Sequence, residues 1–120
     1  MEERFLCEWA ALSRGELDRL FKSYRRICVA YSSVRRDSRG ATLGLGGIVC
    51  SEAYRMRALI LSLDDPIERE LLYRHYVEGL TLERSGEKLF LSLRTATRVK
   101  RRGLDNILNT ISLFSTTAYP

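Results

Sequence analysis

The sequence has few of the residues that most catalytic and metal-binding sites use. It contains one histidine, three cysteines and one tryptophan in 120 residues. Cys7, Cys28 and Cys50 are odd in number and widely spaced, so they predict neither a disulfide framework nor a zinc site, and we expect three reduced thiols. No nucleophile, base and orienting group can be assembled around His75 alone. The sequence therefore predicts no enzyme, no cofactor and no bound metal ion.

Long apolar runs are also absent. No stretch approaches the ~20 residues needed to cross a bilayer. The first residues, Met1-Glu2-Glu3-Arg4, lack the basic and then apolar layout of a secretion signal. The sequence thus predicts a cytoplasmic protein with no membrane partner. A chain of 120 residues with 45% apolar content allows one domain, or one domain plus an arm, and excludes a large multidomain enzyme.

The net charge of +5 is unevenly distributed along the chain. A moderately basic protein can be basic for solubility alone, so the position of the charges is more informative than their sum. Between Leu93 and Gly103 there are five basic residues and no acid. The five are Arg94, Arg98, Lys100, Arg101 and Arg102. Acids gather upstream instead, at Asp64, Asp65, Glu68 and Glu70.

The first predicted helix begins at Arg14. Ser13 and Glu16 form a capping box, and Leu12 with Leu17 is placed to act as a hydrophobic staple. Apolar residues then recur at spacings of three and four, which predicts one buried stripe along a long helix. The stripe comprises Leu17, Leu20, Phe21, Tyr24, Ile27, Cys28, Tyr31 and Val34.

This stripe can pack inside the monomer or against the same helix of a second chain. A separate apolar arm would otherwise expose a large patch, which favours a homo-oligomer. The residues predicted to form the oligomer contact are Leu17, Leu20, Phe21, Tyr24, Ile27 and Tyr31.

A glycine-rich segment follows, with Gly40, Gly44, Gly46 and Gly47. It lacks the Gly-Lys-Ser/Thr ending of a nucleotide-binding loop, so a linker is the better interpretation. A second helix is expected from near Ser51. The residues that it should bury are Ala53, Met56, Leu59, Ile60 and Leu63.

Three further helices are predicted from their caps. Asp65 and Pro66 open a helix to Glu78, and Gly79 closes it. Thr81 caps a short helix to Lys88 or Leu89, and Ser92 caps the last one. The last helix should bury Ala96, Val99, Gly103, Leu104 and Ile107, with no clear helical stripe beyond Asn109. The expected fold is all-α, divided into a helical arm (1–36), a linker (37–50), a helical domain (51–109) and a tail (110–120).

A short helix, a three-residue turn and a longer basic helix match the helix-turn-helix arrangement, in which the second helix enters the major groove of DNA. From residue chemistry, Arg94 and Arg98 can pair with guanine, and Thr95 or Thr97 can touch a thymine methyl group or a phosphate. The remaining cations, Lys100, Arg101 and Arg102, are expected to neutralise phosphates and to make affinity depend on salt.

Several short motifs stand in register between Leu63 and about Leu108. They are Glu68-Arg69, His75-Tyr76, Glu78-Gly79, Thr81-Leu82-Glu83, and Ser92 with Thr95. In this order and spacing they resemble the promoter-reading fourth region of bacterial sigma factors. The resemblance covers roughly the last half of the chain before its tail.

The resemblance implies direct DNA contact by Leu93, Arg94, Thr97 and Arg98, with Thr81 and Arg84 near phosphate. The whole predicted DNA-binding set is Thr81, Arg84, Ser92, Leu93, Arg94, Thr95, Thr97, Arg98, Lys100, Arg101 and Arg102. Three residues depart from the family pattern: Ser85, Ala96 and Phe90. Phe90 stands where the turn prefers glycine, so we expect either another turn shape or compensation by burial.

The region before residue 65 does not resemble the polymerase-clamp region of a complete sigma factor. The layout of arm, linker, helix and sigma-like end is similar to phage and prophage late-gene regulators of the ArpU and RinA type. Two functions follow as hypotheses. One is a sequence-specific regulator that binds double-stranded DNA; the other is a protein-interaction module that engages RNA polymerase or another regulator.

Overall fold

The part of the chain that the structure describes consists of helices joined by short turns. The computed structural model describes Trp9, residues 11–37 and residues 44–118, and it describes the side chains there except those of residues 26–37, 44–51 and 114–118. The elements are α2 (Arg14–Asp37), α3 (Gly44–Leu61), α4 (Pro66–Leu72), the π-helical turn η1 (Tyr73–Val77), α5 (Leu82–Lys88) and α6 (Leu93–Ala118). Within these ranges there is no strand, which confirms the predicted all-α class.

Helix α2 begins at Arg14, as its cap predicts. The amide of Ser13 donates to Oε1 of Glu16 and the amide of Glu16 donates to Oγ of Ser13, each at 3.2 Å. These hydrogen bonds lower the pKa of Glu16. The capping box therefore forms as a reciprocal pair.

The apolar stripe of α2 packs inside the monomer as far as its side chains are described. Leu17 and Phe21 have no exposed surface, and Tyr24 is buried beside them. Trp9 packs against this stripe, with its ring 5.7 Å from Phe21 and 6.1 Å from Tyr24. Leu20 is partly buried against the same core. The side chains of Ile27 and Tyr31 lie outside the described residues.

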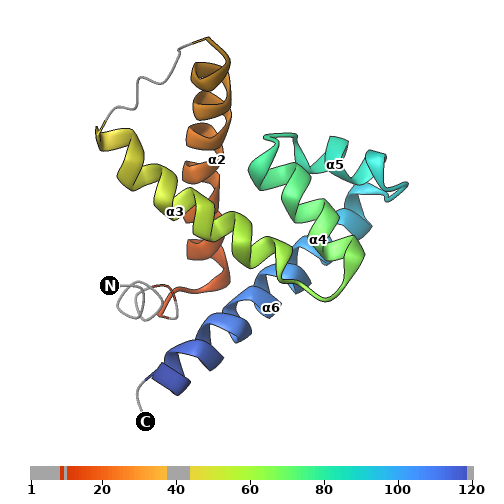
Figure 1. Cartoon of the computed structure of the whole chain (residues 1–120). Helices are drawn as coiled ribbons and strands as arrows, with labels where there is room; N and C mark the ends of the chain where they lie inside the picture. Colours follow the sequence, from red (N-terminus) through yellow and green to blue (C-terminus); the bar gives the residue numbers. More distant parts are fainter. Residues whose placement is uncertain (1–8, 10, 38–43, 119–120) are drawn as a thin grey trace.

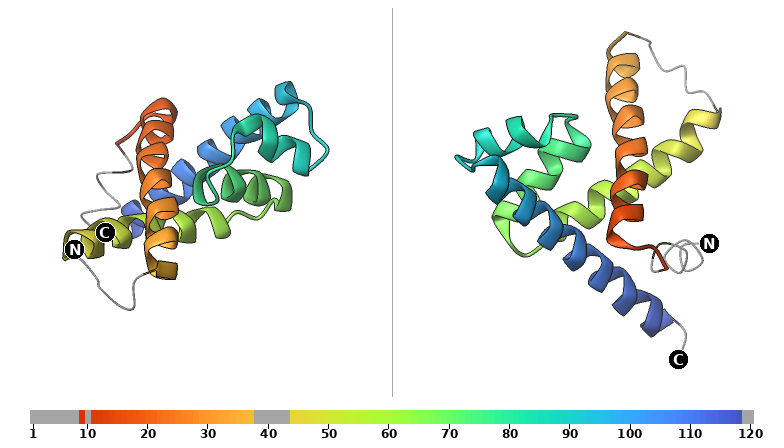
Figure 2. Two further views of the ribbon diagram at one scale, coloured as in Figure 1. Left: turned by 90° about the horizontal axis from the view of Figure 1, so that it is seen from above. Right: turned by 180° about the vertical axis from the view of Figure 1, so that it is seen from behind.

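Helix α3 lies against α2 (Figures 1 and 2) and begins at Gly44, earlier than the expected start near Ser51. Part of the predicted linker is thus helical. Each glycine lowers helix stability by about 1 kcal/mol relative to alanine, but tertiary context commonly overrides propensity. The expected core residues of this helix are confirmed: Ala53, Met56, Ile60 and Leu63 are buried, and Leu59 is partly buried.

The predicted helix to Glu78 is divided into two helical types. Asp65 caps α4 by accepting from the amide of Ile67 at 2.9 Å. From Tyr73 the chain continues as a π-helix, and the amide of Glu78 donates to the carbonyl of Tyr73 at 3.1 Å. Gly79 then adopts a φ of 81°, the left-handed conformation that the sequence predicts for it.

Helix α6 is longer than predicted. Ala96, Val99, Leu104 and Ile107 are buried as expected, but the helix runs on to Ala118 instead of ending near Asn109. Its buried face continues to Ile111, which has no exposed surface. Helices α4 and α5 gather around the first half of α6, while its second half extends past them (Figure 1). None of the described helices is long and apolar enough to cross a membrane.

Candidate nucleic-acid interface

A tight turn joins α5 to α6. Thr81 caps α5 by accepting from the amide of Arg84 at 3.2 Å. After the helix ends, the amide of Leu91 donates back to the carbonyl of Gly86 at 2.8 Å, and that of Phe90 donates to Glu87 at 3.1 Å. These backbone hydrogen bonds set the direction in which the chain enters α6.

Phe90 occupies the left-handed region of backbone space at the centre of this turn. Its φ is 59°, and 98% of its surface is exposed. Both expected outcomes are therefore wrong: the turn keeps the shape that glycine would favour, and burial of the Phe90 ring does not compensate for it. A side chain in this conformation costs about 1–2 kcal/mol. The turn thus combines a strained backbone at Phe90 with an exposed aromatic ring.

Helices α5 and α6 approach each other closely at Gly86. A Cβ atom at this position would lie 2.9 Å from Cβ of Ala96 and 3.3 Å from the carbonyl oxygen of Leu91. Ser85, which departs from the family pattern, is fully buried and donates to the carbonyl of Thr81 at 2.8 Å. Because the residues at this crossing are small, the start of α6 packs closely against α5.

Ser92 and Thr95 cap the start of α6. Oγ of Ser92 accepts from the amide of Thr95 at 3.2 Å and donates to its Oγ1 at 3.0 Å. One turn later, Oγ1 of Thr97 donates to the carbonyl of Leu93 at 2.8 Å. The hydroxyl groups of this segment are thus engaged with α6 itself.

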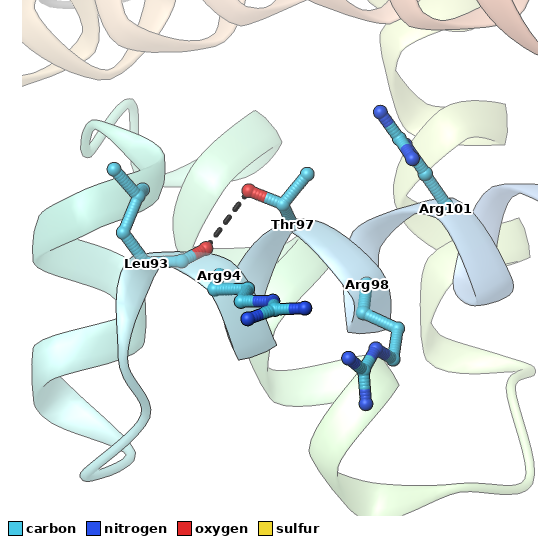
Figure 3. Close-up of a pocket in the computed structure, with 5 residues that line it drawn as sticks. All are labelled: Leu93, Arg94, Thr97, Arg98 and Arg101. Carbon is cyan, nitrogen blue, oxygen red and sulfur yellow. Dashed lines mark hydrogen bonds between the residues drawn. The ribbon is translucent and has the colours of Figure 1, made fainter.

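An open hollow of about 470 Å³ lies along the outer side of α6. It is lined by Leu93, Arg94, Thr97, Arg98 and Arg101, which we call the arginine face. Figure 3 shows Leu93, Thr97 and Arg101 pointing to one side of the helix and Arg98 pointing to the other. Within the part of the chain that the structure describes, none of its three arginines forms an ion pair. Three guanidinium groups therefore remain available to an outside partner.

Lys100 is directed away from the arginine face and pairs with α2. Its Nζ lies 3.0 Å from Oδ1 of Asp18, and its side chain is only 15% exposed. The hydroxyl of Tyr76 also donates to Asp18, and Lys22 lies 3.2 Å from the same carboxylate. Partial burial alone would raise the pKa of Asp18, but these hydrogen bonds and the positive charges hold it below its usual value.

Arg102 is also engaged within the monomer. Its Nε donates to Oε2 of Glu68 at 2.8 Å, and its Nη2 lies 3.4 Å from Asp65. Glu68 is 2% exposed and also accepts from Nδ2 of Asn106 at 2.7 Å. A buried carboxylate requires such partners, so Arg102 joins α4 to α6.

The predicted site residues are thus sorted into three groups. The first group is the arginine face, which brings together Leu93, Arg94, Thr97, Arg98 and Arg101. The second group is exposed at the starts of α5 and α6 and comprises Thr81, Arg84, Ser92 and Thr95. The third group is paired with acidic side chains and comprises Lys100 and Arg102. Sequence analysis missed both acid partners. For Glu68 a signal existed, because its spacing from Leu71 and Leu72 places it on the buried side of α4.

Helix α2 borders the arginine face on one side. A second hollow of about 220 Å³ separates its first turn from α6, with Arg14 and Asp18 on one side and Thr97 and Arg101 on the other. Arg14 also reaches Asp105 of α6 at 3.1 Å. Helix α2 therefore covers the Lys100 side of α6, while Arg94 and Arg98 remain exposed.

The described ranges contain few other candidates for a metal-binding or catalytic site. No group of three or more histidine, cysteine, aspartate or glutamate side chains there is placed to hold a metal ion. His75 is buried, with Nδ1 2.8 Å from the carbonyl of Leu80.

Comparison of the chain with known family models, curated proteins and solved structures gives no match.

Proposed function

We propose that this chain is a sequence-specific DNA-binding transcriptional regulator, encoded by a phage or prophage, that places α6 in the major groove. In this proposal α5, the turn at Phe90 and α6 form a helix-turn-helix of the sigma region 4 type. The observation that carries it is the arginine face, whose three guanidinium groups are exposed on the first three turns of one helix and form no ion pair with any residue that the structure describes. The major groove admits an α-helix and presents acceptors that arginine can bind in pairs.

The structure narrows the set of residues that the proposal assigns to DNA. Arg94 and Arg98 are assigned to base edges, and Arg101 to phosphate. Lys100 and Arg102 are left out, since each is bound to a carboxylate. Thr81 and Arg84, exposed at the start of α5, are assigned to the DNA backbone, which the first helix of such a motif crosses.

Oligomerisation through α2 stays a separate proposal. Leu17, Phe21 and Tyr24 already fill the core of the monomer, so a contact between two α2 helices would have to use the part of the stripe beyond Tyr24. Such a dimer would present two copies of α6 to two half-sites.

The test is a selection of duplexes from a random-sequence pool by the full-length chain, followed by anisotropy titrations at two salt concentrations. The test variant is Arg94→Ala/Arg98→Ala. Its control is Arg19→Ala/Arg57→Ala, which removes the same charge from exposed positions on α2 and α3. We expect each base-reading arginine to contribute about 10- to 100-fold in affinity. Equal affinity of both variants for the selected duplex would contradict the proposal.

A second function is favoured by one observation, the exposed ring of Phe90. Exposed aromatic rings are enriched where proteins bind other proteins. In this alternative the sigma-like end engages RNA polymerase or another regulator and hardly touches DNA. Retained DNA affinity together with loss of polymerase binding in Arg94→Ala/Arg98→Ala, or in Phe90→Ala, would favour it.

A further inference from the structure

The arginine face contains an apolar centre in addition to its cations. Leu93 is the first residue of α6, and 53% of its surface is exposed beside three arginines. An exposed leucine alone needs no explanation. Here, however, it lines the hollow that the proposed function places against DNA, so its chemistry has to suit that ligand.

Thr97 adds a second apolar group to this centre. Its hydroxyl donates to the carbonyl of Leu93 at 2.8 Å, so the oxygen is directed back to the helix backbone. Figure 3 shows this hydrogen bond, with the remaining methyl carbon of Thr97 on the same side of α6 as the Leu93 side chain. The pair therefore offers carbon atoms, and no free hydrogen-bond donor, to the hollow.

The charges around Leu93 and Thr97 restrict which ligand can occupy the hollow. Arg94, Arg98 and Arg101 line the same hollow, and the first acid after them along α6 is Asp105, which pairs with Arg14. An apolar protein side chain would satisfy the centre but would leave the three cations in contact with nothing of opposite charge. A ligand that combines a small apolar group with acceptors and negative charge satisfies both.

In the major groove of DNA one group has this character. Thymine presents its 5-methyl group there, next to the O6 and N7 acceptors of neighbouring guanines and the flanking phosphates. We infer that Leu93 and the methyl group of Thr97 bind the 5-methyl group of a thymine, while Arg94 or Arg98 pairs with a guanine next to it. This inference rests on the proposed function and assigns Leu93 as a specificity-determining residue.

The experiment replaces single thymines by deoxyuridine, which removes only the methyl group. The probe is the duplex selected by the wild-type chain from the random pool, with each thymine changed in turn. At one thymine we expect wild-type affinity to fall about four-fold, the contribution of one buried methyl group. For Leu93→Ala the same change should have a much smaller effect, because the Leu93 part of the contact is already lost and only the methyl group of Thr97 remains.

Two pairs of variants separate this contact from general effects. Leu61→Ala removes a leucine of similar exposure, 48%, from the end of α3 and should keep the full methyl effect. Thr97→Val keeps the methyl group of Thr97 and should keep most of the effect, whereas Thr97→Ser removes that group and should reduce it. Circular dichroism of each variant establishes that α6 remains folded.

The outcomes are distinguishable from those of the proposed function. If the chain selects no duplex, both the proposed function and this inference are wrong. If it selects a duplex but no deoxyuridine change weakens wild-type binding, DNA binding stands and the thymine contact is wrong. If the methyl effect is the same in wild type and Leu93→Ala, another residue reads the thymine.

Discussion

Lys100 of α6 lies 3.0 Å from Asp18 of α2, with its ammonium group 5.9 Å from the centre of the Tyr76 ring. The hydroxyl of Tyr76 donates to the same carboxylate. One lysine of the basic run is therefore part of the contact between α2, η1 and α6. Basic residues that are close in sequence have different roles, set by the side of the helix on which each lies.

This division predicts opposite effects for two substitutions on α6. Lys100→Met should lower the free energy of unfolding by roughly 1–2 kcal/mol, because Asp18 loses a charged partner, and should leave DNA affinity nearly unchanged. Arg98→Ala should leave stability nearly unchanged and lower DNA affinity about 10-fold or more. Urea unfolding and anisotropy on the same samples measure both quantities. A large loss of affinity in Lys100→Met would show that the lysine binds DNA.

Phe90→Gly should stabilise the fold. Phe90 has a φ of 59° and is almost fully exposed, so glycine removes backbone strain without creating a cavity. The expected gain is about 1 kcal/mol, which raises Tm by several degrees in a domain of this size. Calorimetry of the two proteins tests it. A lower Tm for Phe90→Gly would mean that the ring contributes more to the folded chain than the strain costs.

Gly86→Ala and Gly15→Ala should change stability in opposite directions. At Gly86 the new methyl group would lie 2.9 Å from Cβ of Ala96, so α5 and α6 must separate, at a cost of about 1–3 kcal/mol. At Gly15 it meets no atom within 4 Å, and the gain in helix propensity should stabilise α2 by a few tenths of a kcal/mol to about 1 kcal/mol. Chemical denaturation of both variants provides the comparison. Equal destabilisation would contradict the close approach at Gly86.

Stability should decrease on mild acidification because of His75. Burial, together with the charges of Lys100, Arg25 and Lys22, lowers its pKa from 6.5 to about 4, although the hydrogen bond to Leu80 opposes the shift. Between these values the unfolded chain binds the proton and the folded chain does not. The contribution of His75 to the free energy of unfolding should therefore be constant above about pH 7 and fall as the pH decreases from about 6.5 to about 4.

Denaturation curves of wild type and His75→Gln across this range test the assignment. The variant should show a shallower decrease, since it lacks the titrating group. Asp18 and Asp65, whose pKa values are lowered, lose their contributions only at more acidic pH and are present in both proteins. Identical slopes in the two proteins would assign the decrease to another residue.

Local signals predicted the starts of α2, α4, α5 and α6 well, but not the start of α3, which lies at Gly44 and not near Ser51. The caps at Ser13, Asp65 and Thr81 depend on residues within three positions of each other, and each forms the expected hydrogen bond. The turn glycine at Gly79 is also local, because its φ follows from the end of the preceding helix. Such features need no knowledge of the tertiary fold.

Features that depend on distant contacts were not predicted. The sequence does not reveal that Asp18 would face Lys100, since 82 positions separate them along the chain. The pairing of Arg102 with Glu68 likewise depends on how α4 crosses α6. Ile111 did carry a signal that was overlooked, for it continues the helical spacing of Leu104 and Ile107. Because Lys100 and Arg102 are paired with acids, the arginine face contains only three of the five basic residues between Leu93 and Gly103.

The buried half of α6 bears on the thermodynamics of association with any partner. Leu104, Ile107 and Ile111 are buried in the core that includes Trp9 and Phe21, so the backbone of α6 becomes ordered when the monomer folds. The entropy that the α6 backbone loses on becoming helical therefore belongs to the free energy of folding and not to that of binding. Binding through Arg94 and Arg98 then orders side chains of α6 but not its backbone, unlike binding by a basic segment that folds on its target. The heat-capacity change of binding should accordingly reflect the contact surface alone, without a contribution from coupled folding.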